Sequence, residues 1–156
     1  SEDDITLGNP MVDKVKEIAA GEGAQALAIS AGIEEEIAAL PEDEKAEYLS
    51  ALGIEKSGLD RLIQTSYSLL GLISFLTIGE DECRAWTTRI GAHAPEAAGE
   101  IHTDLQRGFI RAEVIDYPTF MECGSMNVAK EKGLLRVEGK EYVVRDGDML
   151  NIRFNV

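Results

Sequence analysis

The sequence predicts an α+β protein in two parts: a helix-rich first part, and a second part in which a mixed sheet packs on one main helix. Apolar residues recur at helical spacing along most of residues 9–70, and the pattern changes to alternation from Leu72. Charge changes at a similar point: residues 1–60 carry 15 acidic and 4 basic residues, whereas residues 61–156 carry 14 and 11. A length of 156 residues accommodates one domain or two small ones.

The composition excludes several classes of protein. Hydrophobic residues make up 44% and charged residues 28%, as in ordinary globular domains. The longest apolar stretch, residues 69–78, is too short for a membrane span, which needs roughly 20 residues. The sequence opens without a signal-peptide pattern, and Cys83 and Cys123 fit no metal or disulfide pattern, so we expect a cytoplasmic protein with free thiols. The net charge of −14 disfavours DNA and general RNA binding, which depend on neutralising phosphates.

Residues 1–70 are predicted to be mostly helical with one strand. Asn9 and Pro10 begin a helix over 9–20, because asparagine caps helices and proline suits their first position. The uncharged run 25–30 predicts a buried parallel strand. Further helices are predicted at 33–40, at 42–50 after Pro41, and from Ser57 to about Leu70.

Residues 71–156 are predicted to form a small sheet domain. The predicted elements are a hairpin of 72–78 and 83–90, a helix at 94–107, a strand at 109–115, a loop and short helix at 117–133, and a second hairpin of 141–145 and 149–156. In the last strand apolar and polar residues alternate from Leu150, which predicts one core face and one exposed face. This order of elements is that of a β-grasp, ubiquitin-like roll with four or five strands.

Several strings resemble the Obg-like ATPases of the YchF family, in particular the TGS domain at the C-terminal end of those proteins. They are ECRAWT at 82–87, APEAAGEIHTD at 94–104, GFIRAE at 108–113, GKEYVVRDGD at 139–148 and FNV at 154–156. GLDRLI at 58–63 and ISAGIE at 29–34 extend the resemblance over nearly the whole chain. It implies that residues 1–70 are the last segment of a nucleotide-binding domain and residues 71–156 a TGS domain.

The resemblance also implies part of a nucleotide-base site. Ser30, Ala31 and Gly32 are similar to the last base-contacting motif, where small residues let backbone amides approach a planar ring. The family's Asn-x-x-Glu motif would end at Glu2, with its asparagine before this sequence. ATP and Mg²⁺ are expected for the complete family member, with ATP or GTP preference left open.

A Gly-x-x-x-x-Gly-Lys-Ser/Thr phosphate loop does not occur in this sequence. We therefore expect no ATP hydrolysis, no catalytic residue and no metal ligand from this chain alone.

A partner or RNA face is predicted on Arg84, Trp86, Arg111 and Arg153, because aromatic and guanidinium groups stack on bases. The competing and favoured interpretation places Trp86 in the core. Acidic residues among these bases, such as Glu113, weaken the case for RNA. The ribosome, through its RNA or proteins, is the expected partner.

Other polar clusters in the sequence have both a chemical and a structural interpretation. His102, Asp104 and Glu100 suggest a small hydrolase, but positions two apart on a helix diverge, which favours a helix-end hydrogen bond. Asp146-Gly147-Asp148 lacks the remaining ligands of a calcium loop and favours a turn. The acidic runs 34–36 and 42–44 are interpreted as solvated helix faces, with a docking site for a basic partner as the alternative.

The leading prediction is a partner-binding module that couples docking to the nucleotide state of an upstream ATPase domain. A stand-alone ubiquitin-like adaptor or an RNA-binding module is the alternative. Apolar faces in residues 1–70 would lie uncovered without the rest of a parallel layer, so self-association is also expected.

Overall fold

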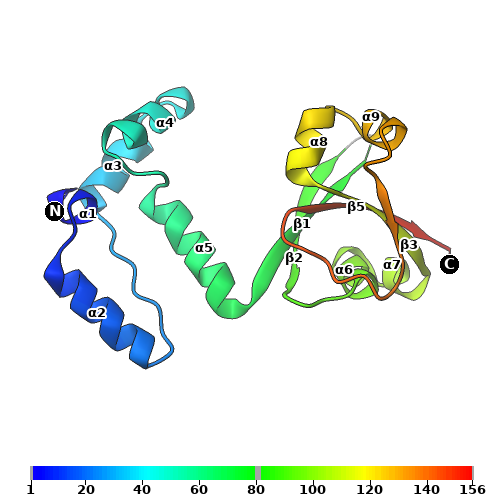
Figure 1. The fold of residues 1–156 in the computed structure, drawn as a ribbon, viewed down its shortest axis with the longest axis horizontal. Coiled ribbons are helices and arrows are strands. Elements are labelled where there is room, and N and C mark those ends of the chain that lie inside the picture. Colours follow the sequence, from blue (N-terminus) through cyan, green and yellow to red (C-terminus); the bar gives the residue numbers. More distant parts are fainter. Residues whose placement is uncertain (1, 80–81, 156) are drawn as a thin grey trace. The chain divides into compact units, whose positions relative to one another are not determined.

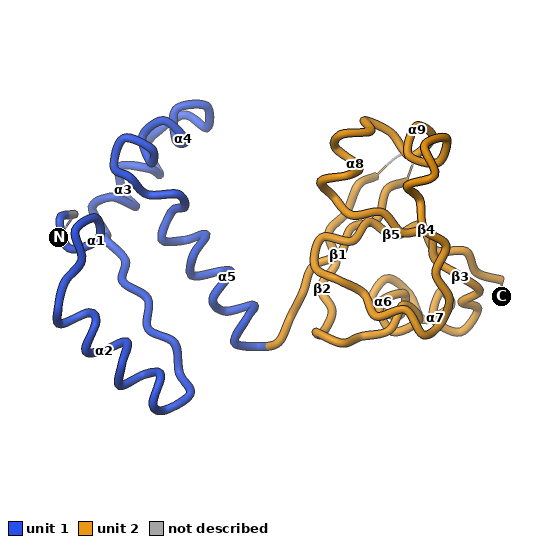
Figure 2. Tube along the Cα trace, viewed as in Figure 1, with its two compact units in different colours: residues 1–70 blue, residues 71–156 orange. Residues whose placement is uncertain are grey.

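The computed structural model describes residues 2–79 and 82–155 and divides into two compact units, residues 1–70 and 71–156 (Figure 2). The division falls where the alternating pattern begins in the sequence. The regular elements described in unit 1 are all helices, and unit 2 is built on a five-stranded sheet. The α+β fold class is confirmed.

Unit 1 contains a series of helices, several of which begin at a side-chain cap. They are α1 (Glu2–Thr6), α2 (Pro10–Gly21), α3 (Ala31–Ala39), α4 (Glu42–Ala51) and α5 (Gly58–Leu70). The Asn9 side chain accepts the Met11 N–H at 2.8 Å, and the Ser57 hydroxyl accepts the Asp60 N–H at 3.0 Å. These bonds satisfy donors that a helix leaves unpaired at its first turn, so the predicted starts are confirmed.

The strand predicted at 25–30 is not formed. The segment is irregular, and Ala26, Leu27 and Ala28 are half-buried beside α2 rather than fully buried. A parallel strand exists only through hydrogen bonds to neighbouring strands. The described residues of unit 1 contain no strand that could supply them.

Unit 2 has a mixed sheet in the order β2-β1-β5-β3-β4 (Figure 1). Its strands are β1 (Leu72–Ile78), β2 (Cys83–Arg89), β3 (Phe109–Asp116), β4 (Arg136–Glu138) and β5 (Asp148–Phe154). The central strand β5 runs parallel to β1 and antiparallel to β3, and the other pairs are antiparallel. The first predicted hairpin, β1 with β2, is confirmed.

Helices cover both faces of this sheet (Figure 1). The helices are α6 (Ala94–Ile101), α7 (Thr103–Arg107), α8 (Tyr117–Cys123) and α9 (Met126–Glu131). On one face Phe75, Val114 and Leu150 pack with alanines of α6. On the other face Ile115 and Met149 pack with Ala129 of α9. The predicted helix at 94–107 is divided at His102, whose backbone is extended with φ −162°.

The second predicted hairpin is wrong. Residues 141–145 form no strand, and β5 pairs with β1 and β3. Asp146 turns the chain toward β1, because its carboxylate accepts the Ser74 N–H at 2.8 Å. In the last strand Leu150 is buried and Arg153 exposed, as the alternation predicted, whereas Phe154, predicted on the core face, is 46% exposed.

Within the described part of the chain, no helix is long and apolar enough to cross a membrane.

Candidate functional site

The predicted base loop lies at the start of α3. Ser30 caps this helix, with its hydroxyl accepting the Ile33 N–H at 3.4 Å, and Ala31 and Gly32 are exposed in the first turn. Buried Ile33 and Ile37 anchor the helix behind them. The loop therefore presents small side chains and first-turn amides to the outside, which leaves its backbone accessible to a planar group.

Glu2 begins α1, and its side chain lies outside the described residues. Ile5, one turn further along α1, lines the same small cavity as Ser30. The structure thus brings α1 beside the loop at residues 30–32.

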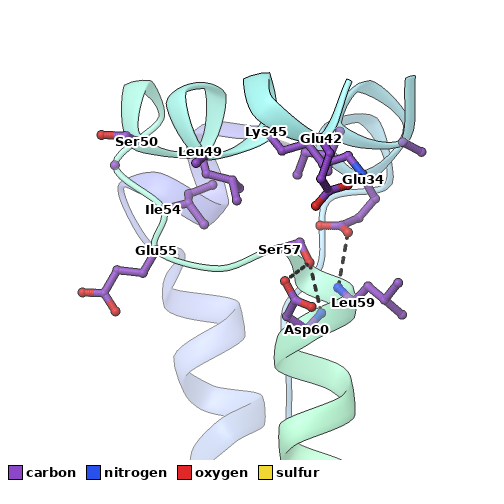
Figure 3. A pocket seen from close by; sticks show the side chains of 14 residues that line it. Glu34, Glu42, Lys45, Leu49, Ser50, Ile54, Glu55, Ser57, Leu59 and Asp60 are labelled. Carbon is purple, nitrogen blue, oxygen red and sulfur yellow. Dashed lines mark hydrogen bonds and ion pairs between the residues drawn. The ribbon is translucent and has the colours of Figure 1, made fainter. Parts of the chain in front are cut away.

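Glu34 connects this loop to α5, a role that the sequence analysis missed (Figure 3). Its carboxylate accepts the N–H groups of Gly58 at 2.6 Å and Leu59 at 3.3 Å. A carboxylate is favourable there because the N-terminus of a helix carries partial positive charge. A Cβ at Gly58 would lie 2.7 Å from Glu34 Oε1 and 2.8 Å from Ile29 Cγ2. Gly58 therefore contacts residues on both sides of the base loop.

One side of α2 exposes apolar side chains. Met11 is 76% exposed and Val15 57%. With Leu27 and its neighbours they line an apolar groove of about 270 Å³. Single exposed apolar residues are common, but a continuous groove is typical of a surface that packs on something else.

The predicted partner face is divided by the sheet. Trp86 packs against the core under α6, and its indole N–H donates to Thr77 Oγ1 at 2.9 Å. The Arg84 guanidinium lies 4.3 Å from the centre of the Trp86 ring, a cation–π contact on the same face.

Arg111 and Arg153 lie on the opposite face from Arg84 and Trp86. They are direct cross-strand partners in β3 and β5, and side chains alternate along a strand, so both point away from Ala112 and the α6 core. Arg153 donates to the Glu113 carboxylate at 3.1 Å, with 54% of its side chain exposed. The predicted set of four residues is therefore two separate pairs.

A buried polar network holds the segment that was predicted to be a strand. Asp148 is 2% exposed and accepts the Tyr142 hydroxyl at 2.6 Å and the Arg145 N–H at 2.9 Å. Arg136 donates to the Tyr142 oxygen at 3.2 Å. Burial and the bond to Asp148 raise the pKa of Tyr142. Burial opposes the charge on Arg136, but Tyr142 and the nearby carboxylates outweigh it, so the Arg136 pKa is raised.

The other candidates have structural partners. His102 Nδ1 accepts the Asp104 N–H at 3.2 Å at the start of α7, the helix-end bond that was favoured over catalysis. Asp146 and Asp148 both bind protein N–H groups. Among the described residues, no three His, Cys, Asp or Glu side chains are grouped to hold a metal ion. Cys83 and Cys123 are free thiols.

The fold and site define a class: a two-unit α+β chain in which a helical unit with a small-residue loop precedes a mixed sheet covered on both faces. A family model named YchF-GTPase_C, described as a protein of unknown function (DUF933), matches residues 72–155. The chain belongs to the YchF family, and it is similar to the C-terminal part of those proteins.

Individual relatives agree with this assignment. The chain is 54% identical to a protein of Bacillus subtilis named ribosome-binding ATPase YchF, over 100% of this chain and 43% of that protein. It is 47% identical to the Escherichia coli O157:H7 protein of the same name, over 95% of this chain and 41% of that protein. The chain thus spans about two fifths of the length of these relatives.

Solved structures extend the comparison to the fold. The Schizosaccharomyces pombe YchF GTPase superposes with a TM-score of 0.78 at 35% identity, covering 98% of this chain and 41% of that one. A GTP-binding protein from Pyrococcus horikoshii superposes with a TM-score of 0.63 at 16% identity, which shows a shared fold alone.

Proposed function

We propose that this chain is the partner-binding and regulatory part of a ribosome-associated Obg-like ATPase. In this proposal residues 71–156 form a β-grasp module of the TGS type that docks to the ribosome. Residues 1–70 supply one part of a nucleotide pocket, and residues outside this sequence supply the rest. Relatives named ribosome-binding ATPase support the choice of partner.

The contrast between the two units supports this division of labour. Unit 2 buries apolar side chains on both faces of its sheet, as a module that folds by itself does. Unit 1 exposes an apolar groove along α2 and small residues at 30–32. Hydrolysis would require a phosphate loop, which this sequence lacks, so we propose that ATP and Mg²⁺ bind only where that loop is present.

The Arg111 and Arg153 pair is the proposed docking surface, and it is the observation on which this part of the proposal depends. Like charges directly opposite each other on a sheet destabilise it. The Glu113 carboxylate offsets part of this repulsion by accepting hydrogen bonds from Arg153 and Asn151. Two exposed guanidinium groups held side by side suit a phosphate backbone or an acidic protein surface. Arg84 is less suited, because its guanidinium already lies over Trp86.

Co-sedimentation with ribosomes tests this surface. We expect Arg111→Ala with Arg153→Ala to reduce the pelleted fraction several-fold, and Arg84→Ala on the opposite face to leave it unchanged. Binding should weaken as salt rises, because phosphate contacts are screened. Loss of pelleting with Arg84→Ala alone, or equal pelleting of all variants, would reject the proposed face. A stand-alone adaptor predicts that no form of the chain pellets.

A further inference from the structure

A cleft in unit 1 combines an apolar floor with acidic edges. Helices α3 and α4 and the segment that leads into α5 enclose about 1030 Å³ (Figure 3). Apolar side chains from all of these elements line it, namely Ile37, Ala38, Ala46, Leu49, Ile54 and Leu59. This volume is close to the upper limit of binding pockets, which measure roughly 300–1000 Å³.

The charged groups of the cleft are strongly unbalanced. Four carboxylates line it, those of Glu34, Glu42, Glu55 and Asp60, against the single ammonium group of Lys45. Lys45 is already paired with Glu42 at 2.7 Å. The surroundings have the same sign, since residues 31–60 contain nine acidic residues and two lysines. Such a field attracts cationic groups and repels nucleic acid.

The carboxylates divide into two kinds. Glu34 and Asp60 are engaged at the start of α5, where Glu34 accepts backbone N–H groups and Asp60 accepts the Ser57 hydroxyl at 2.8 Å. Glu42, whose side chain is 89% exposed, and Glu55, also exposed, lie toward opposite ends of the cleft (Figure 3). The first kind shapes the cleft. The second is exposed to a partner, Glu55 directly and Glu42 as the exposed member of its ion pair with Lys45.

Leu59 supplies an apolar contact at the mouth. It follows Gly58 in the first turn of α5, and it is 59% exposed. Apolar surface between two charged ends fits a partner segment that is apolar on one side and basic at its flanks, since burial of Leu59 adds to the charge attraction.

We propose that this cleft binds a lysine- and arginine-rich amphipathic helical segment of a partner protein. The apolar side of the segment covers Leu59, Leu49 and Ile54, and its basic residues pair with Glu42 and Glu55. This proposal is independent of the sheet surface on unit 2 and of nucleotide binding.

The test uses a fluorescein-labelled peptide of roughly 14 residues, about four helical turns, built from leucine at helical spacing and lysine elsewhere. A scrambled peptide of the same composition removes the apolar side while keeping the charge. Fluorescence anisotropy at about 0.15 M salt measures the Kd of each peptide for the whole chain. We expect saturable binding of the patterned peptide and at least about fivefold weaker binding of the scrambled one. Equal affinities, or no binding, would overturn the proposal.

Matched charge reversals localise the site. Glu42→Lys with Glu55→Lys should raise the Kd about tenfold or more, since attraction becomes repulsion at both ends. Asp43→Lys with Glu35→Lys changes the net charge equally, and Asp43 shares the first turn of α4 with Glu42, but neither residue lines the cleft. This control should change the Kd by less than about threefold. Equal weakening by both pairs would mean non-specific attraction and overturn the proposal.

Two further measurements distinguish binding in the cleft from binding elsewhere on the chain. Leu59→Asn should weaken binding while circular dichroism stays unchanged, and peptide-induced NMR shifts should map to residues 34–60. Shifts confined to residues 71–156 would overturn the proposal. So would concentration-dependent dimerisation that Leu59→Asn abolishes, because the occupant would then be a second copy of this chain.

Discussion

Gly58 shows how one small residue organises unit 1. Its N–H donates to Glu34, and its missing side chain leaves room for both Glu34 and Ile29. These two residues flank Ser30, Ala31 and Gly32, so the start of α5 contacts the chain on both sides of the predicted base loop. Under the nucleotide role proposed for residues 30–32, a displacement of this loop would reach α5 through the contact at Gly58.

Gly58→Ala should destabilise unit 1 by about 1–3 kcal/mol, because the added methyl group overpacks the site and displaces the Glu34 carboxylate from the helix N-terminus. Urea unfolding followed by far-UV circular dichroism measures the change. Gly21→Ala is the control, since a Cβ there meets nothing within 4 Å and alanine favours helix. Equal loss of stability in both variants would contradict the role given to Gly58.

At the scale of elements, the sequence predicted what local interactions decide. The starts of α2 and α5 follow from Asn9 and Ser57, whose side chains bond within three residues of themselves. The cap at Ser30 was not predicted, and α3 begins two residues before the predicted helix at 33–40. Strand pairing depends on partners distant in sequence, and it was predicted poorly. Residues 141–145 were predicted to pair with the last strand, yet their backbone bonds residues 92–94 instead, and β5 pairs with β1 and β3.

The Tyr142 network explains why that segment is a fixed loop, and it makes a pH prediction. Tyr142→Phe removes a donor from buried Asp148 and should cost unit 2 about 1–3 kcal/mol near pH 8. The pKa of Tyr142 is raised in the folded state. Stability from the neutral phenol is therefore fully present below the ordinary tyrosine pKa of about 10, and it is lost as pH rises through the folded-state pKa.

Urea midpoints followed by Trp86 fluorescence measure this difference, since the only tryptophan of the chain lies in unit 2. The gap between wild type and Tyr142→Phe should narrow above pH 10. A gap that stays constant or widens with pH would show that the phenol proton does not contribute.

At the scale of the whole molecule, the candidate site was only partly predictable. The loop at 30–32 and the basic residues were found from sequence strings. The prediction that Arg84, Trp86, Arg111 and Arg153 share one face was wrong. The face on which a side chain lies depends on strand register as well as on residue type. Glu34 was missed because its partners are 24 and 25 residues away, and local patterns do not indicate contacts of that length.

The unequal burial of the two units predicts different behaviour when they are separated after Leu70. Residues 71–156 should unfold cooperatively and remain monomeric, because both sheet faces are covered. Residues 1–70 should bind a hydrophobic dye and self-associate through the exposed groove on α2.

Met11→Gln with Val15→Gln should reduce both effects, whereas Lys14→Gln with Lys16→Gln, outside the groove on the same helix, should not. Sedimentation velocity measures self-association, and dye fluorescence measures exposed apolar surface. A first unit that stays monomeric and binds no dye would show that its apolar groove does not drive association.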